Sequence, residues 1–315
     1  MTVHFGITLP DVWGDISTQA CEIESLGYDY LAVEEHFMKG DPPTPTPLAL
    51  PLLAVAAGAT ESLKLLTSVI LTPFYHPTLL AKLAGTIDIA SGGRLTLGVG
   101  IGGEYPAEFE ANEVNIKERG SRTNEALELL RLLWTEKDVK YLGKHFQLDH
   151  VTLLPRTVQT PHPPIWVGGR QEAAMKRAAR FGDGWFPYFF NPERYTHSRN
   201  KILGFAEGFG KDMRNFQWGA SIFISIQEDK PSAIKSAAEQ MSNQFTDSGD
   251  FTKVAEKYVA AGTPDECAES ILRYYKSGAR YLIFNPVCES KEKQKHLEII
   301  ANEIIPIIRS EVKGS

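Results

Sequence analysis

The sequence has few cysteines, no long apolar segment and no excess of positive charge. Its three cysteines, Cys21, Cys267 and Cys288, lie far apart among 315 residues, so they offer neither a disulfide framework nor a CxxC metal pair, which suits a reducing cytoplasm. The longest weakly polar run, Pro47 to Ala59, is too short to span a bilayer. A formal net charge of −6 argues against nucleic acid or an anionic membrane as a partner. We therefore expect a cytoplasmic protein that binds neither.

Two cofactor patterns are also missing. The one GxGxxG match, residues 98–103, begins inside a predicted strand and does not open a predicted helix, so no dedicated NAD(P) domain is expected. A metal-dependent hydrolase on a barrel fold would need a His-x-His after its first strand, where this sequence has only Thr8, Leu9 and Pro10. No metal site is predicted.

Segments with strand-like and helix-like spacing alternate along the chain, giving eight predicted strands that are each followed by a helix. The strands are expected at residues 3–9, 28–33, 65–71, within 91–104, and at 164–167, 184–187, 217–226 and 280–284. Eight such units need roughly 250 residues, so the surplus fits insertions after strands four and seven. We predict one (β/α)8 TIM barrel domain over residues 1–315. A doubly wound sheet is the alternative, but it normally uses fewer strands.

The stretch Ser91 to Glu104 (SGGRLTLGVGIGGE) reads as a turn, a buried strand and a second turn rich in glycine. Gly98 and Gly100 remove side chains from one face of this strand, so another group is expected to lie close against it. A narrow barrel interior and a flat ligand on the glycine edge both fit this pattern.

The carboxyl ends of the strands are where a barrel builds its active site. After predicted strand five, Gly168 and Gly169 precede a helix, where free N–H groups at the positive end of the helix dipole would bind phosphate. Arg170 adds positive charge. The alternative is a tight turn that needs glycine for its shape alone.

Predicted strand two ends in Glu34, Glu35 and His36. His36 is the best acid–base candidate, because an unperturbed histidine titrates near neutral pH. The two glutamates alternate in direction, so at most one faces the site. Glu104 is a candidate second acid, and the alternative is a solvated loop carboxylate.

Several segments together resemble the bacterial luciferase-like monooxygenases, a superfamily of (β/α)8 enzymes that use reduced FMN or the deazaflavin F420. The matching segments are Glu35-His36-Phe37, residues 67–77 (TSVILTPFYHP), 91–109, 118–120, 161–170 (PHPPIWVGGR) and 178–185. They extend from predicted strand two to strand six, and the general layout extends over nearly the whole chain.

The resemblance implies a flavin-like ring over the ends of strands three and four, with its phosphate at Gly168-Gly169. Members often have a bulge in strand three with a non-proline cis peptide, and Ser68-Val69 matches that place. His36 falls where the family places an active-site histidine. The predicted cofactor-binding residues are Ser68, Val69, Thr72, Gly100, Gly102, Gly168, Gly169 and Arg170, and the predicted catalytic residues are His36 and Glu104.

The resemblance leads to a predicted monooxygenase that uses reduced FMN from a separate flavin reductase, with O2, to oxygenate a small organic substrate. An F420-dependent hydride-transfer enzyme is the second interpretation. Users of F420 typically place a glutamate just beyond the strand-four glycines, and Glu104 lies near that place, displaced by one extra glycine. The third is a flavin-binding protein without activity. A homodimer is the family expectation.

Overall fold

The computed structural model describes residues 2–40, 42–244 and 250–314. Within this part of the chain, eight parallel strands close into a ring in the order β1, β2, β3, β5, β8, β9, β10, β12 and back to β1. The strands are β1 His4–Thr8, β2 Tyr30–Val33, β3 Lys64–Thr67, β5 Leu95–Gly100, β8 Ile165–Val167, β9 Gly184–Trp185, β10 Gln217–Ile226 and β12 Tyr281–Pro286. The predicted (β/α)8 barrel is confirmed.

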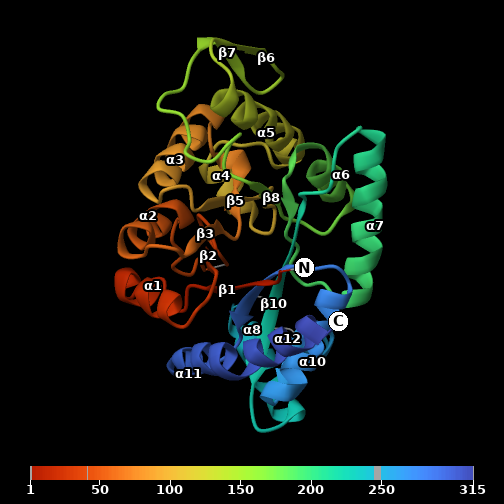
Figure 1. Cartoon of the computed structure of the whole chain (residues 1–315). Helices are drawn as coiled ribbons and strands as arrows, with labels where there is room; N and C mark the ends of the chain where they lie inside the picture. The colour runs from red at the N-terminus through yellow and green to blue at the C-terminus, as the bar shows by residue number, and fades with distance from the viewer. Residues whose placement is uncertain (1, 41, 245–249, 315) are drawn as a thin grey trace.

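Helices surround the barrel (Figure 1). They are α1 Ile16–Ser25, α2 Ala49–Ala59, α3 Pro77–Ala90, α5 Arg119–Thr135, α6 Glu172–Phe181, α7 Pro192–Gly208, α10 Pro264–Lys276, α11 Lys293–Ile299 and α12 Ile305–Gly314, with the π-helical turn η4 Ile300–Ile304 between the last two. Local sequence fixes several helix starts. Asp15 caps α1 by accepting hydrogen bonds from the N–H groups of Ser17 and Thr18, and Thr263 forms a capping box with Glu266 at α10. None of the helices in the described residues has the length and apolar character that crossing a membrane requires.

The two longest connections follow β5 and β10, where insertions were predicted. After β5 come α4 Pro106–Ala111, η2 Ile116–Glu118 and, beyond α5, an antiparallel hairpin of β6 Val139–Leu142 and β7 Gln147–Val151. This hairpin projects at the top of the view in Figure 1. After β10 come α8 Lys230–Gln244, α9 Thr252–Tyr258 and β11 Val259–Gly262, which pairs with the last part of β10.

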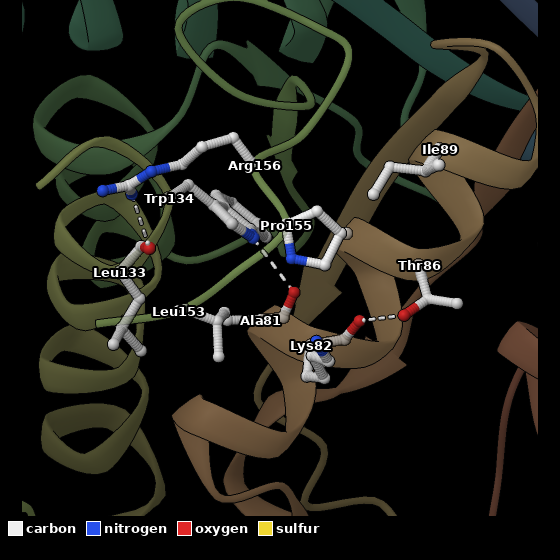
Figure 2. A pocket seen from close by; sticks show the side chains of 10 residues that line it. Ala81, Lys82, Thr86, Ile89, Leu133, Trp134, Leu153, Pro155 and Arg156 are labelled. Atoms are coloured by element: carbon white, nitrogen blue, oxygen red, sulfur yellow. Dashed lines mark hydrogen bonds between the residues drawn. The ribbon is translucent and has the colours of Figure 1, made fainter. Parts of the chain in front are cut away.

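The chain that returns from the hairpin to the barrel packs on α3 and α5 (Figure 2). Arg156 donates a hydrogen bond to the Leu133 carbonyl (3.2 Å), and the Trp134 indole N–H donates to the Ala81 carbonyl (3.0 Å). The pocket between these elements has a volume of only about 10 Å³. That is room for at most about one water molecule, so this contact holds the insertion in place and is too small for a ligand.

Predicted strand three, residues 65–71, is not one strand. It divides into β3 and a short β4, Ile70–Leu71, which pair with successive parts of β5. Ser68 and Val69 lie between them and are joined by a cis peptide bond, as the family resemblance implied.

Two of the three buried hydrophobic clusters in the described residues show how the barrel is packed. A cluster inside the barrel contains Tyr30, Leu66, Trp166, Phe186 and Ile283, all buried. A larger cluster fills the layer between the strands and the surrounding helices. The barrel interior is therefore packed with side chains, and only its carboxyl end is hollow.

Candidate functional site

The carboxyl ends of the strands surround a cavity of about 390 Å³, which we call the inner cavity. Its wall comes from the segments that follow β2, β3, β5, β8 and β9, with contributions from β4, β10, β12, α5 and α6. Nine of the ten predicted site residues line it, namely His36, Ser68, Val69, Gly100, Gly102, Glu104, Gly168, Gly169 and Arg170. These residues are distant in sequence, and the barrel brings them together.

Thr72 is the exception. It begins the 3-10 helix η1, Thr72–Phe74, is fully buried, and is not part of the cavity wall. Its hydroxyl oxygen has no hydrogen-bond partner among the described residues. Leu71, its neighbour, is the residue of this segment that reaches the cavity.

His36 is held against a buried carboxylate that sequence reasoning missed. Its Nδ1 atom lies 3.1 Å from Oε1 of Glu108, a fully buried residue of α4. The same oxygen accepts hydrogen bonds from the backbone N–H groups of Phe37 (2.7 Å) and Met38 (3.0 Å). The His36 side chain remains 18% exposed and lies on the cavity wall. His36 is therefore paired with Glu108 through Nδ1, and part of its ring remains exposed to the cavity.

The two glutamates before His36 face different ways, as their alternation predicted. Glu35 is buried and accepts hydrogen bonds from the N–H groups of Ala49 (3.1 Å) and Leu71 (3.2 Å) and from the Tyr75 hydroxyl (3.0 Å). Burial raises the pKa of Glu35. Glu34 is exposed, and its carboxylate accepts a hydrogen bond from the Asn285 side chain (2.9 Å). Both glutamates border the cavity, but Glu35 is buried and connects β2 to its neighbours, whereas Glu34 is exposed.

Glu104 lies at the mouth of the inner cavity and is not a free loop carboxylate. It accepts a hydrogen bond from the Tyr188 hydroxyl, whose segment follows β9. Burial and the Glu104 charge raise the pKa of Tyr188. The Arg170 guanidinium stacks over the Tyr188 ring at 4.9 Å. Three loops therefore meet at the cavity mouth through Glu104, Tyr188 and Arg170.

The bulge between β3 and β4 accounts for the glycines of β5. A Cβ atom on Gly98 would collide with the Thr67 carbonyl oxygen, and one on Gly100 would lie 2.6 Å from a methyl group of Val69. A Cβ atom on Gly168 would lie 3.3 Å from the other methyl group of Val69. The group that lies against Gly98 and Gly100 is therefore the bulge at Val69. The missing side chains of these glycines allow Val69 to reach the cavity.

The Gly168-Gly169 segment differs from its prediction in one respect. The N–H of Gly168 is not free, because it continues the barrel ladder with a 2.8 Å hydrogen bond to the Val99 carbonyl. Gly169 has a φ of 115°, which glycine adopts readily, and directs the chain into α6. At the start of α6, the described residues provide no acceptor for the N–H groups of Gln171 and Glu172. The open donors thus lie at the helix start rather than at Gly168.

Two arginines that sequence reasoning did not single out as site residues complete this end of the cavity. Arg177, on α6, is buried, and its guanidinium donates only to the Asn124 side chain (2.8 Å) and the Gly120 carbonyl (3.2 Å). Burial lowers the pKa of Arg177 to about 10. Arg119 donates to the Ile116 carbonyl (2.7 Å), but its Nε atom is buried without a partner among the described residues.

Neither arginine forms an ion pair with a carboxylate in the described part of the chain. A buried cation without a counter-charge is costly, so Arg177, the buried Nε atom of Arg119 and the open start of α6 give this end of the inner cavity the charge and the donors that an anion would need. We call Arg119, Arg177 and the start of α6 the arginine end.

A second, outer cavity of about 740 Å³ adjoins the inner one. The two share Glu34, Glu35, His36, Lys39 and Asn285 in their walls. The remainder of the outer wall comes from the β1–α1 connection, the loop before α2 and the start of α11. Trp13, 64% exposed, stands at its rim. His36 therefore lies between two cavities.

Known proteins resemble this chain along most of its length. A family model described as luciferase-like monooxygenase matches residues 2–281. An F420-dependent glucose-6-phosphate dehydrogenase of Amycolatopsis mediterranei is 26% identical, over 94% of this chain and 95% of the relative. A 5,10-methylenetetrahydromethanopterin reductase of Archaeoglobus fulgidus is also 26% identical, over 91% of this chain and 93% of the relative.

Solved structures agree with the fold. A monooxygenase of Streptomyces bottropensis superposes with a TM-score of 0.82 at 28% identity, over 96% of this chain and 99% of that chain. An F420-dependent secondary alcohol dehydrogenase, solved with an F420–acetone adduct, superposes with a TM-score of 0.84 at 20% identity, over 98% and 99% of the two chains. At that identity, the second structure speaks for the barrel fold alone.

Proposed function

The chain belongs to the luciferase-like monooxygenase family and is an oxidoreductase, and we propose that it works with a reduced flavin-type cofactor in the inner cavity. The observation that carries this proposal is the arginine end. Donors that lack an acceptor or a counter-charge among the described residues gather there: the buried Arg177 guanidinium, the buried Nε atom of half-buried Arg119 and the first N–H groups of α6. A cofactor phosphate would supply both.

The residues present fit such a cofactor. Arg119, Arg177 and the start of α6 would hold the phosphate, and Ser68, Val69, Gly100 and Gly102 would bear the ring, since they form the cavity wall where the β5 glycines leave room. Arg170 stacks on Tyr188 at the mouth, so we assign it to closing the cavity rather than to the phosphate. When bound, the cofactor supplies the electrons, and the protein supplies position, a dry site and proton transfer.

Reduced FMN with O2, and therefore a monooxygenase, is the first candidate. The monooxygenase of Streptomyces bottropensis, 28% identical over almost the whole chain, supports it. A separate flavin reductase would provide the reduced cofactor, because no GxGxxG motif in this sequence both follows a strand and opens a helix, as NAD(P) binding requires.

F420-dependent hydride transfer is the second candidate. The two curated relatives described above have names that connect them to hydride chemistry, and the dehydrogenase is F420-dependent by name. Glu104 also lines the cavity close to the β5 glycines, where the family resemblance places the glutamate of F420 enzymes.

His36 and Glu104 are the two groups we assign to proton handling. His36 stands on the wall shared by both cavities, so its ring can hold or move a proton between cofactor and substrate. Glu104 accepts the Tyr188 hydroxyl hydrogen bond at the mouth and is the second candidate acid. We assign the organic substrate to the outer cavity, which opens onto His36.

Two further proposals concern the setting of the protein. A homodimer is supported by exposed apolar side chains on the adjacent helices α2 and α3, where Val55, Leu79 and Leu83 are 45%, 54% and 37% exposed. A monomeric Leu79→Glu variant beside a dimeric wild type in sedimentation would support this interface. A cytoplasmic location is supported by the three free cysteine thiols.

A binding titration tests the function. The purified protein is titrated with FMN, reduced FMN and F420, followed by fluorescence. Micromolar binding of FMN in either redox state, with F420 ignored, supports the first candidate. A preference for F420 supports the second and removes oxygen from the mechanism. If none of the three binds, the arginine end does not hold a flavin phosphate and the proposal fails.

A further inference from the structure

We propose that Glu108 is a positioning residue that fixes the tautomer of His36, so that Nδ1 carries the proton and Nε2 faces the two cavities. The relevance of this arrangement to turnover rests on the proposed function. The arrangement itself can be measured in the protein without any cofactor.

The hydrogen-bond pattern of Glu108 carries the inference. Oε1 accepts backbone N–H bonds from Phe37 and Met38, and Nδ1 of His36 lies 3.1 Å from the same oxygen and 3.4 Å from Oε2. A carboxylate oxygen can only accept, and Oε1 already accepts from two backbone N–H groups. The proton between the two side chains therefore belongs to Nδ1.

The rest of the His36 environment leaves one nitrogen available. Tyr105 packs edge-on against the imidazole at 5.2 Å, and the His36 carbonyl accepts the Thr46 hydroxyl hydrogen bond, so ring and backbone are both held. No partner for Nε2 is present among the described residues, and His36 borders both cavities. In water, neutral histidine has no such constraint, and either nitrogen can carry the proton. Glu108 thus decides which lone pair meets the substrate.

This pairing resembles the way a buried carboxylate orients a catalytic histidine in hydrolases, where the wrong tautomer costs most of the activity. A purely structural role is the competing explanation, since Glu108 also joins the segment after β2 to α4. The test must therefore measure a property, the position of the His36 proton, that would stay the same if Glu108 only stabilised the fold.

That readout is the nitrogen NMR spectrum of the full chain labelled with 15N at histidine. The His36 signals are identified by their loss in a His36→Asn variant. Above the range where imidazoles titrate, we expect the wild type to show a protonated Nδ1 and an unprotonated Nε2. In Glu108→Met and Glu108→Ala, which offer no acceptor to Nδ1, we expect the proton to move to Nε2 in at least half of the molecules.

Glu110→Gln is the matched control, because Glu110 is an exposed glutamate on the same short helix. It should leave the His36 spectrum unchanged. Glu108→Met removes the acceptor but fills most of the same space, so it tests the proposal even if Glu108→Ala does not fold.

Two results would overturn the proposal. One is a wild-type spectrum with the proton on Nε2. The other is an unchanged His36 tautomer in Glu108→Met or Glu108→Ala, with only thermal stability lowered, which would make Glu108 a structural residue. Because these spectra need no cofactor, failure here is distinct from failure of the flavin titration.

Discussion

Arg94 and Arg177 are both buried guanidinium groups, 7% and 6% exposed, but the protein surrounds them differently. Arg94 precedes β5 at the amino end of the barrel. It donates to the carbonyls of Ser91, Leu63, Ala57 and Thr60 and to the Thr60 hydroxyl. Each of its three nitrogens therefore has an acceptor. Arg177, near the carboxyl end, donates one bond to a side chain and one to a carbonyl and faces a cavity.

The difference separates stability from function within one barrel. A buried charge whose donors are all satisfied helps to hold the chain together, since its removal leaves acceptors unpaired. A buried charge with partners missing lowers stability and is retained where something else supplies them. The amino end of this barrel thus reads as structural and its carboxyl end as functional, in line with the general division in TIM barrels.

Replacing Arg94 should have the largest effect on stability. An Arg94→Met variant leaves several buried carbonyls without a donor, at about 1–3 kcal/mol each, so we expect the free energy of unfolding to fall by about 3–5 kcal/mol. The affinity of the folded variant for FMN or F420 should stay within about threefold of the wild type. Urea unfolding and a fluorescence titration measure the two quantities. A weakened cofactor affinity with unchanged stability would contradict the structural role that we assign to Arg94.

Replacing Arg177 should do the opposite. We expect Arg177→Met to lower cofactor affinity by roughly 100-fold, because a charge-assisted hydrogen bond to phosphate contributes about 1.5–3 kcal/mol. The free energy of unfolding should not fall, since an uncompensated buried charge is removed. The same titration and urea unfolding measure both quantities. Arg180→Gln, at an exposed position of the same helix, is the control and should leave both unchanged. Equal affinity for wild type and Arg177→Met would exclude Arg177 from the phosphate site.

Sequence alone predicts most of the fold because its signals are local. The predicted alternation of strands and helices and the insertions after strands four and seven all appear in the structure. The division of predicted strand three could not be derived from apolar spacing, because residues 65–71 are apolar on both sides of the bulge. The position of its cis peptide came only from the family resemblance.

The site was predicted less completely, because its missing parts depend on tertiary contacts. Glu108 reaches His36 across 72 residues, and no local pattern indicates that pairing. Arg177 did leave a signal. It follows Ala174 by three residues and precedes Ala178 and Phe181 on the buried face of α6, and a charge on an apolar face needs an explanation. The free N–H predicted at Gly168 was wrong, because the barrel ladder uses it.

Adding a side chain at Gly100, in the wall of the inner cavity, should have an intermediate effect on stability and on cofactor affinity. In Gly100→Ala the new methyl group would lie 2.6 Å from Val69, so the bulge must shift, and we expect a loss of about 1–3 kcal/mol in the free energy of unfolding together with weaker FMN binding. Gly58→Ala is the control. Gly58 lies in α2 with open space around it, and the same substitution there should stabilise the protein by about 0.4–1 kcal/mol. Thermal unfolding and FMN titration of both variants distinguish the effect of a new methyl group at the cavity from that of the same group on helix α2. A Gly100→Ala protein as stable as Gly58→Ala would show that Val69 is not fixed against β5.

The smallest expected effect is a pH dependence that originates at the amino end. His162 lies buried before β8, donates through Nδ1 to the Pro163 carbonyl (2.9 Å), and has an Nε2 without a partner among the described residues. Burial lowers its pKa below the ordinary 6.5. Between the folded and the unfolded pKa values the unfolded chain binds more protons, so the stability present above pH 6.5 is lost as the pH falls.

We expect the free energy of unfolding to decrease by about 1 kcal/mol from this histidine between pH 7.5 and 5.5, since one pKa unit corresponds to about 1.4 kcal/mol. His162→Gln should show a correspondingly shallower decrease in urea unfolding at the two pH values. His76 and His296, whose pKa values burial also lowers, contribute to both proteins and cancel in the difference. Identical pH dependence of wild type and variant would mean that His162 can be protonated without cost, and the amino end would then lack the tight burial that distinguishes it from the open carboxyl end.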